Sequence, residues 1–99
     1  MMMIYQKIIV HGKVQGVSFR KSAAQKANEL SVKGYVINLS DGTVMMEAEG
    51  YQASMDEFIE WCYIGSVMSD VKKIDIMSGE VKGYKSFRIK NDYSFLFYH

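Results

Sequence analysis

The pattern that decides the fold lies in residues 4–30, IYQKIIVHGKVQGVSFRKSAAQKANEL. Its first part, from Ile4 to Val10, is rich in β-branched residues with polar ones between them, which predicts a strand that ends at a His-Gly pair. From Phe19 onward the apolar positions recur at spacings of four, four and three, which lines one face of a helix. We expect this helix to begin near Ser18, with the Ser18 hydroxyl as its cap.

The next segment has the pattern of a β-hairpin. Side chains alternate from Lys33 to Leu39, which predicts a second strand with Val36 and Asn38 on the same face. Asp41-Gly42 is a strong hairpin signal, because glycine supplies the positive φ that the turn needs. The residues from Thr43 to Glu49 are therefore expected to pair antiparallel with the second strand.

The second half of the chain predicts one more helix and two more strands. Ser54 to Glu57 has the spacing of a capping box, and the apolar stripe from Met55 to Cys62 continues as a helix that ends at Gly65. Val71 to Met77 and Ser86 to Lys90 have strand patterns. Two helices and four or five strands in the order βαββαβ predict an α+β ferredoxin-like sandwich, one antiparallel sheet with two helices on one face.

Length and composition fit one globular domain. The chain has 99 residues, of which 48% are hydrophobic and 23% charged, as in ordinary globular proteins. We expect a single domain over residues 1–99, with a core of about residues 4–90 and an aromatic tail over residues 91–99. The tail is expected to cover the sheet of its own chain, which gives a monomer; the alternative is a dimer or partner contact through the tail.

Charge and residue usage exclude several classes of function. The net charge of +1 gives no long-range attraction to nucleic acid or lipid, and the consensus of RNA-recognition domains is missing. No apolar run approaches the roughly 20 residues that span a bilayer. The lone Cys62 cannot form an internal disulfide, and the two histidines do not form a spaced ligand pair. We therefore expect a cytoplasmic protein without a zinc or copper site.

The junction between the first strand and the first helix has the features of an anion site. Gly12 and Gly16 allow the backbone to curl so that several N–H groups point into one concavity. The start of the helix adds unpaired N–H groups, and Arg20 adds a bidentate donor. Phosphate is therefore expected to bind Arg20 and the backbone amides of Gln15, Gly16, Val17, Ser18, Phe19 and Arg20. The alternative, on spacing alone, is that the glycines only turn the chain and that Arg20 is a solvated surface residue.

Two motifs in this chain resemble those of the acylphosphatase family. Residues 12–20 match Gly-x-Val-Gln-Gly-Val-x-Phe-Arg at every fixed position, and residues 34–44 match Gly-x-x-x-Asn-x-x-Asp-Gly-x-Val. The resemblance implies hydrolysis of small acyl phosphates to a carboxylate and inorganic phosphate, without a metal or cofactor. It also implies that Arg20 binds the phosphate and that Asn38 positions the attacking water.

Two other functions remain to be weighed against hydrolysis. The chain could be a non-catalytic anion-binding module, but simple phosphate binding does not require an amide at the position of Asn38. It could also be an acylphosphatase-like domain of a larger maturation factor, which we do not expect because nothing follows residue 99. Departures from the family pattern occur at Ala23, Met45 and Gly65-Ser66, and none of them removes a catalytic group.

Overall fold

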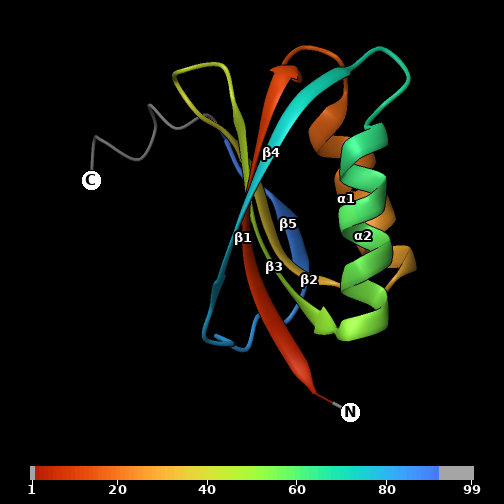
Figure 1. Cartoon of the computed structure of the whole chain (residues 1–99), viewed down its shortest axis with the longest axis vertical. Helices are drawn as coiled ribbons and strands as arrows, with labels where there is room; N and C mark the ends of the chain where they lie inside the picture. Colours follow the sequence, from red (N-terminus) through yellow and green to blue (C-terminus); the bar gives the residue numbers. More distant parts are fainter. Residues whose placement is uncertain (1, 92–99) are drawn as a thin grey trace.

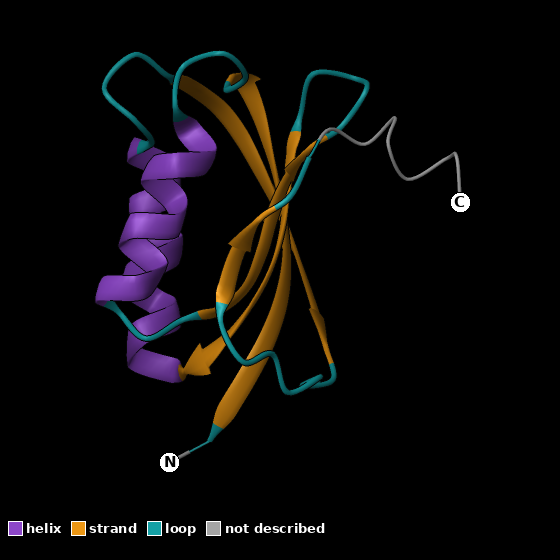
Figure 2. Ribbon diagram, turned by 180° about the vertical axis from the view of Figure 1, so that it is seen from behind, coloured by secondary structure: helices purple, strands orange, loops and turns teal. Residues whose placement is uncertain are grey.

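The computed structural model describes residues 2–91, in which one sheet is covered on one face by two helices (Figure 1). Figure 2 shows the same two layers from behind, and no described helix covers the other face of the sheet. The elements follow in the order β1 Met3–Lys13, α1 Phe19–Glu29, β2 Lys33–Asn38, β3 Val44–Tyr51, α2 Gln52–Ile64, β4 Asp70–Gly79 and β5 Phe87–Ile89. The predicted ferredoxin-like α+β fold is confirmed.

The sheet is mixed, whereas the sequence predicted an antiparallel one. Its strand order is β4-β1-β3-β2-β5, and β5 runs parallel to β2 while the other neighbours are antiparallel. Gly79, at the end of β4, pairs with Tyr5 on β1. Tyr5 also pairs with Glu49 on β3, and Glu49 pairs in turn with Lys33 at the start of β2. A loop that crosses the sheet at this level delivers β5 alongside the start of β2, so the two strands point the same way.

The core lies between the helices and the sheet. Phe19 of α1 and Phe58 of α2 are buried. The ring of Phe19 packs near Trp61, with the ring centroids 5.3 Å apart. The ring of Phe58 packs near Phe87, with the ring centroids 5.8 Å apart. The helix faces predicted from spacing are those that are buried. The core also includes Ile8, Val10, Val36, Val44, Met46, Ala48, Ala23, Ala27, Met55 and Cys62.

Both helix caps differ from the predicted ones. Ser18 is the N-cap residue of α1, but its side chain makes no capping hydrogen bond and its backbone is left-handed, with φ of 60°. α2 begins at Gln52, so Ser54 lies inside the first turn and the capping box is wrong. β3 runs directly into α2, and burial of Met55 and Phe58 sets the start of the helix more strongly than a local cap does.

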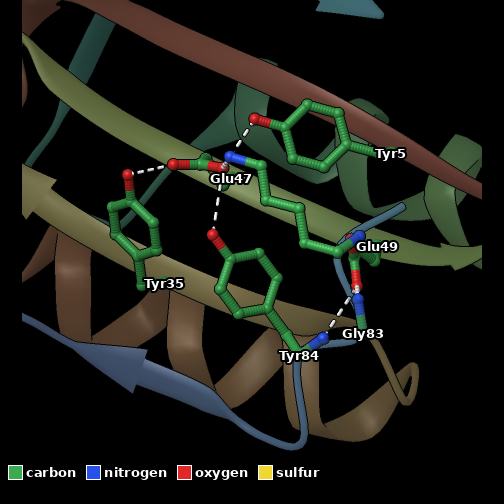
Figure 3. Close-up of polar contacts among 7 residues, drawn as sticks. Tyr5, Tyr35, Glu47, Glu49, Gly83 and Tyr84 are labelled. Atoms are coloured by element: carbon green, nitrogen blue, oxygen red, sulfur yellow. Dashed lines mark hydrogen bonds and ion pairs between the residues drawn. The ribbon is translucent and has the colours of Figure 1, made fainter. Parts of the chain in front are cut away.

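On the sheet face away from the helices, the carboxylate of Glu47 accepts hydrogen bonds from four side chains (Figure 3). The hydroxyls of Tyr5, Tyr35 and Tyr84 donate to it, at 2.6 Å for Tyr5 and 3.0 Å for Tyr84, and the Lys82 ammonium donates at 2.6 Å. Burial alone would raise the pKa of Glu47, but the hydrogen bonds from Lys82 and the tyrosines outweigh it and lower this pKa to about 2. Glu47 thus joins β1, β2 and the loop between β4 and β5.

Glu49 fastens the same loop through the backbone. Its carboxylate is 1% exposed and accepts the N–H groups of Lys82, Gly83 and Tyr84, the last two at 3.0 and 2.9 Å. Two carboxylates on β3 therefore hold the crossing loop against the sheet. Since β5 follows this loop directly, they also help to fix where β5 lies.

Two sequence-based expectations concern the C-terminal tail and the lack of a membrane-spanning segment. The aromatic tail from Tyr93 to His99, predicted to cover the sheet, lies outside the described residues. Within residues 2–91, no helix is both long and apolar enough to pass through a membrane.

Candidate active site

The loop between β1 and α1, residues 14–18, forms a curled backbone. Gly16 has φ of 71° and Ser18 has φ of 60°, so both lie in the left-handed region. A Cβ at Gly16 would meet no atom within 4 Å, which means that conformation rather than space favours glycine there. Serine in this region is strained, and such strain is concentrated at functional sites.

Side chains around this loop hold it to the rest of the fold. The Gln15 amide nitrogen donates to the carbonyl oxygens of Leu39 and Thr43, at 2.8 and 2.9 Å, so the loop is joined to the turn between β2 and β3. On the other side, the Ser66 hydroxyl donates to the carbonyl of Val17 at 2.7 Å. In the part of the chain that the structure describes, the backbone amides of residues 15–18 donate to no backbone carbonyl. These amides therefore suit an anionic ligand.

Arg20 lies in the first turn of α1 and reaches across to the end of β5. Its Nη1 donates to the carbonyl oxygen of Lys90 at 2.7 Å, which fixes the guanidinium beside the curled loop. The position of β5 consequently helps to set the position of Arg20. Nothing in the sequence near Lys90 indicates a contact with a residue in the first helix, so this contact could not be predicted from the sequence.

Asn38 is the last residue of β2 and lies at the same end of the sheet as the loop. It pairs with Val44 on β3, and the next residue, Leu39, is the one held by Gln15. The side-chain oxygen Oδ1 is buried and accepts no hydrogen bond from the described residues. A buried polar atom of this kind costs free energy, so it indicates a place where a polar ligand atom or water binds.

Arg20 and Asn38 line the same cavity, of about 200 Å³. The described residues around it are Val14, Gly16, Ser18, Phe19, Arg20, Lys21, Asn38 and Ile89. This set includes two cations and no acid, and it lies at the start of α1, where the helix dipole is positive. The cavity is therefore suited to a small anion.

Other chemistries receive little support from the described residues. Residues 2–91 contain no group of three or more His, Cys, Asp and Glu side chains that could hold a metal. Cys62 lies on the buried face of α2, and burial raises the pKa of its thiol. It is therefore unsuited to act as a nucleophile.

The fold and the cavity together define a class of protein: a small ferredoxin-like protein with a cavity suited to a small anion at the start of its first helix. The family model described as acylphosphatase matches residues 6–89. The chain belongs to the acylphosphatase family. It is a hydrolase of acid anhydrides that cleaves the carboxyl–phosphate bond of small acyl phosphates.

Individual relatives agree with this assignment over most of their length. An acylphosphatase of Nocardioides sp. is 39% identical over 83 residues, which is 84% of each chain. The structure of an acylphosphatase from Coxiella burnetii has a TM-score of 0.86 at 36% identity, covering 89% of this chain and 93% of that one. The acylphosphatase from Bacillus subtilis gives the same TM-score at 34% identity, covering 90% of this chain and 99% of the other.

Proposed function

We propose that Arg20 and the backbone amides of residues 15–20 bind the phosphoryl group of the substrate, and that Asn38 positions the attacking water. The observation that carries this proposal is that Arg20 and Asn38 line one small cavity, although they come from different elements. The cavity also includes Gly16 and Ser18, whose left-handed backbones curl the loop.

Phosphate binding follows from the donors that converge on this cavity. The planar guanidinium of Arg20 presents parallel N–H groups that match two oxygens of a phosphoryl group. The loop amides and the start of α1 add further donors and a positive potential. During the transfer, negative charge is spread over the three equatorial oxygens, and these fixed donors stabilise it without having to reorient.

The role of Asn38 follows from the chemistry of its amide. Its oxygen accepts a hydrogen bond from water and its nitrogen can donate one, so it can fix a water molecule without becoming charged. The water oxygen forms a bond to phosphorus, and the bond from phosphorus to the acyl oxygen breaks with its electron pair on the carboxylate. The carboxylate is a good leaving group, so alignment and charge neutralisation do most of the work and a strong base is not needed. The proton of the water passes to the phosphate or to solvent.

The experiment is the release of inorganic phosphate from acetyl phosphate by the purified protein, with a chelator present throughout. We expect full activity with the chelator, which would support hydrolysis without a metal. Asn38→Ala should lower kcat about 10²-fold while inhibition by phosphate changes little. Arg20→Ala should raise the inhibition constant for phosphate and remove most turnover.

Matched controls separate the site from general effects of substitution. Asn28 on α1 and Arg88 on β5 are exposed, so Asn28→Ala and Arg88→Ala remove the same functional groups elsewhere and should keep activity close to that of the wild type. Near-normal activity of folded Arg20→Ala would contradict the assignment of Arg20. Joint loss of phosphate inhibition and turnover in folded Asn38→Ala would place Asn38 in the phosphate site rather than at the water.

We also propose that the enzyme acts as a single-domain monomer in the cytoplasm. The near-neutral charge and the lone, buried Cys62 support this, because neither favours a charged partner or an oxidising compartment. Sedimentation at concentrations spanning the assay range tests the monomer. A dimer that dissociates when residues 92–99 are removed would support the tail contact instead.

A further inference from the structure

A second cavity adjoins the one that contains Arg20 and Asn38. It measures about 470 Å³, and Gly16 and Ser18 line both cavities. Figure 1 shows that the loop between α2 and β4 lies at the same end of the molecule as the loop between β1 and α1. The second cavity, which we call the acyl groove, lies between these two loops and includes Val17, Val67 and Met68.

Two apolar side chains of the acyl groove, Val67 and Met68, are not part of the hydrophobic core. Val67 is 99% exposed and Met68 is 66% exposed. They occupy the middle of a turn in which the backbone N–H and the hydroxyl of Ser69 both donate to the carbonyl of Ser66, at 3.0 and 2.7 Å. Turn positions of this kind normally hold polar residues or glycine. Two exposed apolar residues there indicate contact with an apolar ligand.

The turn is fixed relative to the phosphate site. The Ser66 hydroxyl donates to the carbonyl of Val17, so the loop that carries Val67 and Met68 is hydrogen-bonded to the curled loop itself. Gly65, at the end of α2, packs against Phe19, because a Cβ at Gly65 would lie 3.3 Å from the Phe19 ring. The acyl groove therefore keeps a defined position beside the bound phosphoryl group.

Size and direction both place the remainder of the substrate in this groove. Pockets for small molecules usually measure roughly 300–1,000 Å³, so a cavity of about 200 Å³ holds a phosphoryl group and water but little more. In-line displacement puts the leaving oxygen opposite the attacking water. Asn38 lines the first cavity and not the acyl groove, so the acyl group points away from Asn38, toward the groove.

We infer that the acyl groove binds the acyl group of the substrate, and that Val67 and Met68 select acyl phosphates with an apolar chain of several carbons. This inference rests on the proposed roles of Arg20 and Asn38. Among the described residues, Lys13 is the one charged side chain that lines the groove. Its positive charge disfavours acyl groups that carry an ammonium and tolerates neutral ones.

The test compares kcat/KM for hexanoyl phosphate with kcat/KM for acetyl phosphate. In the wild type we expect this ratio to exceed one, because the longer chain contacts Val67 and Met68. The double substitution Val67→Ser with Met68→Ser should lower the ratio at least about tenfold, which is the lower end of the effect of one methylene in an apolar pocket. Both side chains are exposed, so the double variant should fold, which circular dichroism checks.

A matched control and a separate readout make the result specific. Ile64, the last residue of α2, is 70% exposed and does not line the groove, so Ile64→Ser should keep the wild-type ratio. An unchanged ratio in the double variant, or a wild type with no preference for the longer chain, would overturn the inference. If instead the assignment of Arg20 to the phosphate site were wrong, a different measurement would show it, because phosphate would inhibit Arg20→Ala as strongly as it inhibits the wild type.

Discussion

Replacement of Glu47 by glutamine tests how the fold holds the loop between β4 and β5. The pKa of Glu47 is lowered from 4.5 to about 2, against the effect of burial, by hydrogen bonds from Lys82, Tyr35, Tyr5 and Tyr84. A tenfold change in proton affinity corresponds to 1.36 kcal/mol, so the ionised carboxylate contributes about 3 kcal/mol to the free energy of unfolding. The Glu47 side chain is 12% exposed, so solvent screens these contacts little.

The sign of the pH dependence follows from the direction of the shift. Because the folded-state pKa lies below that of the unfolded chain, the contribution is fully present above about pH 5.5 and is lost as the pH falls through about 2. Urea unfolding at a series of pH values, followed by the fluorescence of the single tryptophan, Trp61, measures the free energy of unfolding. Between about pH 5.5 and about pH 2, the free energy of unfolding should fall by about 3 kcal/mol more in the wild type than in Glu47→Gln.

The control is Glu57→Gln, which neutralises an exposed carboxylate on α2. Its pH profile should run parallel to that of the wild type, because exposed charges contribute little to stability. Parallel profiles for the wild type and Glu47→Gln would refute the reasoning, because they would mean that the four donors do not favour the ionised carboxylate.

Three further substitutions or reactions test other contacts. Glu49→Gln should lower the free energy of unfolding in urea by about 2–3 kcal/mol, because both carboxylate oxygens accept backbone N–H groups of the loop and the amide nitrogen that replaces one oxygen cannot accept them. Gly34→Ala should lower the free energy of unfolding by more than about 3 kcal/mol, since the added Cβ would lie 1.8 Å from the Glu47 carbonyl oxygen. Gly83→Ala, where a Cβ would have open space around it, should lower this free energy less in the same assay. Cys62 should react with a thiol reagent only when the protein unfolds, because its side chain is fully buried; reaction at the rate of a free thiol in the native state would contradict this placement.

Much of the fold was predictable because its signals are local. The spacing of Phe19, Ala23 and Ala27 defines a helix face whatever the rest of the chain does, and these residues are buried as expected. Asp41-Gly42 likewise sets its turn through residues that are adjacent in the sequence. The local cap signals at Ser18 and Ser54 were misleading, because packing of the whole helix outweighs one side-chain hydrogen bond.

The sequence by itself determined the order of the elements, the faces of the helices and the two motifs that resemble the acylphosphatases. From the residues alone, it left open whether Arg20 is a ligand-binding residue or a solvated one. Only the tertiary structure decided that β5 lies parallel to β2, that Gln15 reaches the turn after β2, and that Arg20 and Asn38 line one cavity. The physical reason is that these contacts join residues far apart in the chain, whose approach depends on the packing of the sheet and helices and leaves no periodic signal in the sequence.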